Sequence, residues 1–486
     1  MADSMIEREV MDTTRKALFI NLDETIYGTF AEIGGGQEVA RCFFQSGGAS
    51  GTVAKTISAY DMVFSDSIYG KSPTGRYVSQ PRLMQIMDIE YNSLINVLGE
   101  KRAKETRFFV FANTVATLNY RKDNQAHGWL GVRFQLNPES KPNDVIIHVK
   151  LMENDNLLQQ KTLSILGVNL IYACYYNYQY PNSFLKSLME SLSRDRIEID
   201  MISMHGPDLD YVDNRLLAVQ LVKNDMTTVT MFDRYGNVKP PAELLYKKNV
   251  MLLRGSFRPI TYVGFDMLKS GFSLFKDELG FDKQKTIVFC EMTLKNLMEE
   301  GVFDERDFLD RVDILCGMGQ NVMITNFKEF YKISNWFRNY NITNIRLIIG
   351  AITFRKVLEK RFYNHLKGGI LEAFGKLFTE NLKVYLYPAK ENEKEDTITT
   401  SANMVVEEDV RFLYQHLLES NLIVDIPNYR KETLPFFSWK VLVRLNNNDP
   451  EWETMVPKYV SGFIKKKKLF GYGNTKEVEK VKKLQK

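Results

Sequence analysis

Residues 197–254 decide the fold class: IEIDMISMHGPDLDYVDNRLLAVQLVKNDMTTVTMFDRYGNVKPPAELLYKKNVMLLR. Three apolar runs in this stretch predict strands at 197–204, 227–232 and 250–253. Helical spacing of the apolar residues predicts a helix at 209–223. Strands that alternate with helices are typical of βαβ units in a parallel sheet. Apolar, β-branched strands also fit burial on both faces of that sheet.

The same rhythm continues toward the C-terminus. Strands are predicted at 286–289, 322–324, 345–349 and 383–386, with helical segments between them. We therefore expect an α/β protein with a Rossmann-like parallel sheet in its C-terminal half.

The N-terminal region predicts a second α/β or α+β unit. Its apolar runs predict strands at 16–22, 108–113, 128–135 and 144–152, and the last two are separated by a short turn typical of a hairpin. A helix is predicted to begin at Ser79, which can cap it, with Pro81 in its first turn.

Four segments follow from these patterns. We expect an N-terminal domain at 1–180, an α/β segment at 181–275, a Rossmann-like domain at 276–460 and a basic tail at 461–486. The sequence leaves open whether the main boundary lies near 180 or near 260–280.

Composition indicates a globular protein without a basic body. Of 486 residues, 44% are hydrophobic and 26% are charged, as in soluble domains. Residues 461–486 hold nine lysines and two glutamates, a local charge of +7, so the formal net charge of +4 leaves −3 for the other 460 residues. Contact with polyanions is therefore expected only through the tail.

The lack of recognisable targeting signals in the sequence predicts a cytoplasmic protein. The first residues, MADSMIEREVMDTTRK, lack the apolar core of a secretory signal. The longest apolar run, 165–176, is shorter than the roughly 20 residues of a membrane span. The four cysteines form no CxxC pair and suit a reducing compartment. No two histidines are three or four residues apart, so no metal site is predicted.

The main chemical hint is EIGGGQEVARCFFQSGGASGTVAK (residues 32–55). Its two glycine clusters each precede residues able to begin a helix, and each is followed by a cation, Arg41 or Lys55. Glycine lets backbone N–H groups approach a ligand, and a helix N-terminus favours an anion. The stretch matches neither the P-loop nor the G-x-G-x-x-G pattern. Close packing of the glycine backbone against a neighbouring element is the other reading.

Residues at predicted strand ends extend this hypothesis, because ligands bind beyond the carboxyl ends of parallel strands. His205 ends one strand, and LLRGSFRPIT carries two arginines that suit phosphate. Ordinary structural roles, a hydrogen-bonded histidine and arginines paired with carboxylates, remain open. The predicted ligand-binding residues are Gly34, Gly35, Gly36, Arg41, Gly48, Gly51, Lys55, His205, Arg254 and Arg258.

Three motifs carry a resemblance: the stretch GGGQEVARCFFQSGGASGTVAKTISAYDMVFSDSIYG together with HGWLGVRFQ and LLRGSFRPIT. They resemble a family of uncharacterised bacterial cytosolic proteins, over most of the chain. Some members are labelled nicotinate-nucleotide adenylyltransferase, although the H-x-G-H motif of such enzymes is absent here. The resemblance implies no residue roles.

The sequence thus predicts a cytosolic binding protein or enzyme that acts on a nucleotide or another phosphorylated metabolite. Catalytic residues and cofactors stay unassigned. The alternative is a non-catalytic scaffold that self-associates into a homo-oligomer, since the chain is rich in aromatic residues and carries no complete catalytic motif.

Overall fold

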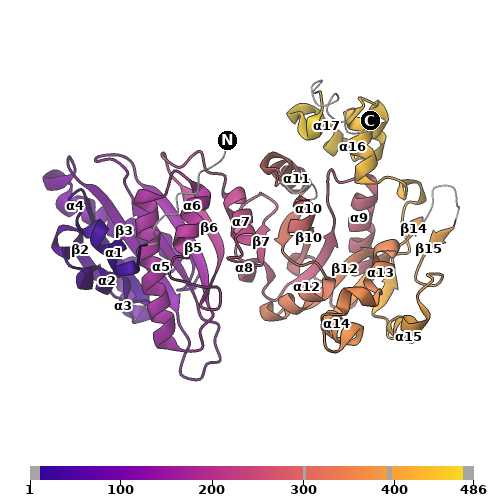
Figure 1. Cartoon of the computed structure of the whole chain (residues 1–486), viewed down its shortest axis with the longest axis horizontal. Coiled ribbons are helices and arrows are strands. Elements are labelled where there is room, and N and C mark those ends of the chain that lie inside the picture. The colour runs from indigo at the N-terminus through magenta and orange to yellow at the C-terminus, as the bar shows by residue number, and fades with distance from the viewer. Residues whose placement is uncertain (1–10, 299–302, 380, 391–396, 474–486) are drawn as a thin grey trace. The chain divides into compact units, whose positions relative to one another are not determined.

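The computed structural model describes residues 11–298, 303–379, 381–390 and 397–473. Its contacts divide the chain into two compact units, Met1–Thr227 (unit 1) and Thr228–Lys486 (unit 2). Both units are α/β, which confirms the predicted fold class (Figure 1). Within the described residues, no helix has the length and apolar character needed to cross a membrane.

Unit 1 is built on a six-stranded sheet in the order β2-β1-β3-β4-β5-β6. Strand β1, next to the edge strand β2, runs parallel to both β2 and β3, while β3 to β6 form antiparallel neighbours. The strands are β1 Ile26–Gly34, β2 Val53–Ile57, β3 Arg107–Ala116, β4 His127–Phe134, β5 Asn143–Leu151 and β6 Ile197–His205.

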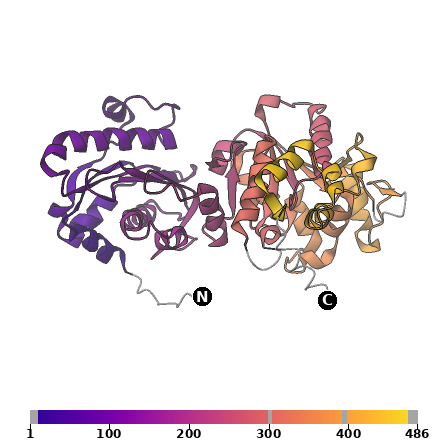
Figure 2. The same cartoon turned by 90° about the horizontal axis from the view of Figure 1, so that it is seen from above.

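Two helical layers cover this sheet, and Figure 2 shows unit 1 from above. Leu83 and Met87 of α4 lie over Gly131 of β4, whereas Gly167 of α5 lies against Phe111 on the other face. One layer holds α3 Met62–Tyr69 and α4 Gln80–Arg102. The other holds α1 Thr13–Asn21, α2 Val39–Ser46, α5 Asn156–Tyr176, α6 Pro181–Leu188 and α7 Asn214–Lys223. As predicted, the Ser79 side chain caps α4.

The strand predicted at 16–22 is wrong, because these residues belong to helix α1. Asp12 caps that helix by accepting a hydrogen bond from the Arg15 backbone N–H at 2.8 Å. Its buried residues, Lys16, Ala17, Ile20 and Asn21, repeat at helical spacing. A short apolar run fits either a buried strand or a buried helix face, so periodicity alone could not separate them.

Unit 2 contains the Rossmann-like sheet. Its strands lie in the order β16-β13-β12-β9-β10-β11-β7-β8. From β11 to β16 all pairings are parallel, and chain order around β9 gives the Rossmann sequence 3-2-1-4-5-6. The strands are β7 Val229–Phe232, β8 Val238–Lys239, β9 Asn249–Arg254, β10 Thr286–Thr293, β11 Asn321–Thr325, β12 Asn344–Gly350, β13 Leu382–Tyr387 and β16 Ile423–Asp425; a separate hairpin pairs β14 Ala389–Lys390 with β15 Ile398–Thr399.

Helices of unit 2 flank this sheet on both faces. Residues of α12, α13, α14 and α15 share one core cluster with Leu252 and Leu347. On the other face, Gly271 of α9 lies against Ile348 of β12. The helices are α8 Pro241–Leu245, α9 Tyr262–Lys276, α10 Leu294–Leu297, α11 Glu305–Gly317, α12 Phe330–Phe337, α13 Ala351–Val357, α14 Gly369–Leu377, α15 Arg411–Glu419, α16 Ser438–Asn446 and α17 Lys458–Lys467.

The predicted segments differ from this division. The predicted segment 181–275 is shared by both units, because β6 pairs with β5 of unit 1 and β7 pairs with β11 of unit 2. The start of the predicted tail is helix α17, in which Val460 and Ile464 are buried. Leu469 is buried as well, so residues up to 473 are packed rather than free. The rest of the predicted tail, 474–486, lies outside the described residues.

Candidate functional site

The first glycine cluster packs against a neighbouring strand. Gly34 has a φ of +84°, and a Cβ there would lie 2.4 Å from the Val115 carbonyl oxygen. The Gly35 N–H donates to that same carbonyl at 3.0 Å. The Asn113 amide donates to Gly36 O and accepts from Ile33 N–H. Close approach of the loop to β3 therefore accounts for these glycines.

The start of helix α2 already holds an anion of the chain itself. The Glu32 carboxylate accepts hydrogen bonds from Val39 N–H at 2.9 Å and Ala40 N–H at 2.8 Å. Burial raises the pKa of Glu32 to about 7, against the opposing effect of these two donors. The donors that the sequence assigned to a phosphate are thus occupied by a side chain.

The second glycine cluster lies at the opposite end of α2. Gly48 precedes and Gly51 ends a 3₁₀ turn, Ala49–Gly51, that leads into strand β2 rather than into a longer helix. Lys55 lies on β2, and its Nζ is 2.5 Å from the buried Glu90 carboxylate. Arg41 is exposed and pairs with Glu38 at 3.4 Å. Both cations are therefore already paired with carboxylates.

His205 stands at the other edge of the sheet. It ends β6, which is antiparallel to β5, and it is exposed opposite Asp144. Because β5 runs in the same direction as β1 and β3, the end of β6 lies at the edge where those strands begin. The structure therefore does not bring His205 to the glycine loop.

Both predicted arginines of unit 2 are neutralised by carboxylates. Arg254 makes a two-pronged contact with buried Glu291, through Nε at 2.6 Å and Nη2 at 2.8 Å. Arg258 Nε lies 2.7 Å from Asp307, which also pairs with Arg311. These contacts are those of structural arginines. The predicted ligand-binding residues therefore fall at several separate places.

A basic loop that the sequence interpretation missed lies at the carboxyl-end edge of unit 1. This loop 70–79, GKSPTGRYVS, joins α3 to α4. The hydroxyl of Thr114, near the end of β3, donates to the Tyr77 carbonyl at 2.7 Å. The loop and the first turn of α4 therefore sit where β1, β2 and β3 end.

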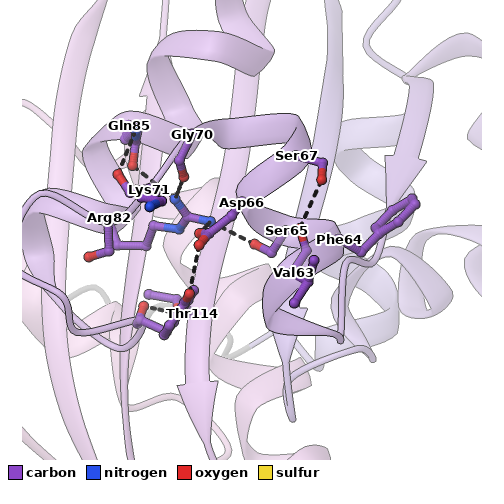
Figure 3. Close-up of polar contacts among 12 residues, drawn as sticks. Val63, Phe64, Ser65, Asp66, Ser67, Gly70, Lys71, Arg82, Gln85 and Thr114 are labelled. Atoms are coloured by element: carbon purple, nitrogen blue, oxygen red, sulfur yellow. Dashed lines mark hydrogen bonds and ion pairs between the residues drawn. The ribbon is translucent and has the colours of Figure 1, made fainter.

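Arg82 of α4 holds the start of this loop through polar contacts, as Figure 3 shows. Its guanidinium is buried and donates to Gly70 O at 2.5 Å and to Ser65 Oγ at 2.8 Å. Asp66, at 3.3 Å, balances its charge and accepts from Tyr77 O–H at 2.8 Å. This buried network joins α3, the loop and α4 into one support.

The backbone of the loop is also fixed from within. The hydroxyls of Ser72 and Ser79 both donate to the Arg76 carbonyl, at 2.7 and 2.9 Å. Gly75 N–H donates to Ser72 O at 3.1 Å. The side chains of Lys71 and Arg76 emerge exposed from this ordered backbone.

Charge pairing separates Lys71 and Arg76 from the predicted cations. Arg41, Lys55, Arg254 and Arg258 each lie within 4.0 Å of a carboxylate. In the part of the chain that the structure describes, no such partner exists for Lys71 or Arg76. The sequence signal was present, since two cations in a Gly/Ser/Thr/Pro-rich segment are typical of an anion-binding loop. Among the described residues, no group of three His, Cys, Asp or Glu side chains could hold a metal ion.

Comparison with known proteins gives little further information. The sequence matches no protein-family model and no curated protein. Solved structures with some likeness include the competence/damage inducible protein CihA from Agrobacterium tumefaciens, at 18% identity over 32% of this chain and 90% of that chain, with a TM-score of 0.22. The competence or damage-inducible protein from Enterobacter asburiae matches at 10% identity over 33% and 95%, with a TM-score of 0.24. A CinA superfamily protein from Klebsiella pneumoniae matches at 8% identity over 33% and 96%, with a TM-score of 0.25. TM-scores this low are no basis for transferring an activity.

Proposed function

We propose that unit 1 binds a phosphorylated metabolite, with nucleotides included, at the edge where β1, β2 and β3 end. Lys71 and Arg76 contact the phosphate. The observation that carries this proposal is the pair of exposed cations that have no carboxylate partner among the described residues, on a loop held by the buried Arg82 network. A guanidinium and an ammonium on a rigid backbone suit an anion better than cations already paired.

Topology supports the same edge. The chain moves from β1 to β2 on one side and then crosses to β3 on the other, so the strand order reverses between β1 and β3. Open α/β sheets bind ligands at such a reversal. Helix α4 adds the positive end of its dipole, because its N-terminus follows the loop directly. The resemblance to the uncharacterised bacterial family stays a prediction.

The test is a calorimetric titration of the full chain with inorganic phosphate and with AMP. We expect the double variant Lys71→Gln/Arg76→Gln to weaken binding about tenfold or more, which corresponds to roughly 1.4 kcal/mol. Arg41→Gln is the matched control, since Arg41 is an exposed cation of the same unit that pairs with Glu38. Equal losses in the double variant and the control would show that only net charge matters, and the site would be wrong.

A second candidate function, self-association, has its own observation. Tyr60, Met62, Val63 and Phe64 are exposed together at the start of α3. β2 is the terminal strand of its sheet, so no strand among the described residues of unit 1 pairs with its outer edge. An unpaired strand edge can pair with the same edge of a second copy.

Analytical ultracentrifugation over a range of concentrations tests this alternative. We expect a dimer that Phe64→Asp converts to a monomer. A wild-type monomer at every concentration would end the scaffold hypothesis.

A further inference from the structure

A chain of three titratable side chains crosses the sheet of unit 1 from β6 to β4. His148 Nδ1 lies 2.5 Å from Asp200 Oδ1, and His148 Nε2 lies 3.1 Å from His127 Nδ1. His148 and Asp200 are buried, and His127 is half-buried. Each residue comes from a different strand, so the sequence places them far apart.

The Asp200 carboxylate orients the first hydrogen bond of this series, the one with His148. Although burial opposes ionisation, the contacts with His148 and Lys150 lower the pKa of Asp200, so Asp200 is a carboxylate. His148 then donates from Nδ1, and in the neutral form of His148 the Nε2 atom accepts from His127 Nδ1–H. The ring of Trp129 lies 4.8 Å from the His148 ring and helps to hold it.

The outer end of the chain is open. Three of the four imidazole nitrogens are hydrogen-bonded inside the protein, and only Nε2 of His127 is left. Among the described residues this atom has no hydrogen-bond partner, and it is not one of the fully buried unpaired atoms.

His127 lies at the edge that carries loop 70–79. It pairs in register with Ala116, the last residue of β3. Burial, and then the facing His148 ring, lower the pKa of His127 to about 4, and the charge of Arg76 acts in the same direction. At pH 7 His127 is therefore a neutral ring with a free lone pair, near a cation assigned to phosphate.

We propose that His127 is a general base served by the relay Asp200–His148–His127, and that unit 1 hydrolyses a phosphate monoester. This rests on the proposed function, because Lys71 and Arg76 hold the ester's phosphate. Nε2 of His127 takes a proton from a water molecule, whose oxygen bonds to phosphorus while the P–O bond to the alcohol breaks. The leaving alkoxide takes the proton back, so the products are the alcohol and inorganic phosphate.

The relay makes this weak base effective. When Nε2 of His127 gains a proton, the Nδ1 proton moves to Nε2 of His148. The positive charge then rests on the ring that contacts the Asp200 carboxylate at 2.5 Å. Glu198 lies beside this pair, and Lys150 contacts both carboxylates at 3.4 to 3.5 Å. Asp200 and His148 are positioning residues, and His127 is the catalytic residue.

The experiment measures phosphate release by the full chain from p-nitrophenyl phosphate and AMP, beside binding of inorganic phosphate. His127→Asn should lower kcat about 100-fold while the Kd for inorganic phosphate changes less than twofold. Asp200→Asn should lower kcat and shift the pH–rate profile, which a merely structural residue would not do. His205→Asn, an exposed histidine of the same unit at the opposite edge, is the control that leaves kcat unchanged.

A wild-type measurement guards against variants that fail to fold. Nitrogen-detected NMR of the histidine rings should show Nδ1–H tautomers for both His127 and His148; an Nε2–H tautomer at His127 would overturn the relay. Phosphate binding without phosphate release would overturn the hydrolysis and leave the proposed function standing. Phosphate release that depends on His127 but not on Lys71 or Arg76 would overturn the proposed phosphate site and leave His127 as a catalytic base.

Discussion

The two units place cations at similar points in their sheets and use them differently. In unit 2, Arg254 is the last residue of the central strand β9 and pairs with the buried Glu291. In unit 1, Lys71 and Arg76 stand at the end of the parallel strands without a carboxylate partner among the described residues. An arginine after a strand is thus evidence for a ligand only when its charge is not already balanced. Four predictions test this distinction.

The largest effect is expected from breaking the ion pair of unit 2. Arg254→Met leaves the fully buried Glu291 carboxylate with one side-chain hydrogen bond among the described residues, from the Thr325 hydroxyl at 2.5 Å. We expect the free energy of unfolding of unit 2 to fall by about 3–5 kcal/mol in urea titrations. Phosphate binding by the folded chain should be unchanged. If Arg254→Met lost phosphate affinity with an unchanged free energy of unfolding, Arg254 would be a ligand contact. The comparison between paired and unpaired cations would then be wrong.

Glu32 tests whether an internal anion replaces a bound one at α2. Because its pKa of about 7 in the folded protein exceeds the ordinary 4.5, the folded state binds the proton more tightly than the unfolded chain. The stability from this group is fully present below pH 4.5 and is lost as pH rises toward 7. The loss is on the order of 3 kcal/mol at most.

Chemical denaturation at pH 4.5 and at pH 7.5 measures this linkage. The difference in the free energy of unfolding between the two pH values should shrink in Glu32→Gln. It should persist in Glu38→Gln, which alters a neighbouring but more exposed carboxylate. An identical pH dependence in Glu32→Gln and the wild type would contradict the assignment.

The glycine loop offers a matched pair of substitutions. Gly34 and Gly47 share nearly the same φ, +84° and +85°, but only at Gly34 would a Cβ collide with backbone. Both alanine variants carry the strain of a positive φ, so their difference isolates the close approach to β3. We expect Gly34→Ala to unfold more readily than Gly47→Ala by about 1–3 kcal/mol in thermal or urea melts. Equal stabilities, with phosphate binding lost only in Gly34→Ala, would restore the loop as a ligand site.

Much of the fold could be predicted from the sequence. Long β-branched runs such as 345–349 identified the parallel strands of unit 2, and Ser79 identified the start of α4. The run 16–22 failed because helix and strand share the same apolar pattern over so few residues. The sequence predicted a boundary near 180 or near 260–280 and not at Thr227, because β6 belongs to the first sheet through its pairing with β5, which no local pattern shows.

The candidate site could be predicted far less well. The glycines near Gly34 were visible, but their packing against Val115 depends on a strand 80 residues away. Pairing of Arg254 with Glu291 and the contact of His127 with His148 also depend on the tertiary fold. A sequence lists its charges, and only the folded chain shows which of them are already balanced.

The smallest effect is expected at the start of the predicted basic tail. The Lys465 ammonium lies 2.5 Å from the Glu453 carboxylate, and both side chains are more than a third exposed. If paired cations are structural throughout this molecule, Lys465→Gln should lower the free energy of unfolding by only about 0.2–1 kcal/mol. Retention on heparin should stay the same, because a charge already balanced adds little attraction for a polyanion.

Glu453→Gln completes a double-mutant cycle, in which the two losses of unfolding free energy should not be additive. A large drop in heparin retention for Lys465→Gln alone would show that a paired, solvent-exposed lysine still binds anions. The comparison between paired and unpaired cations would then hold only for buried pairs such as Arg254 with Glu291.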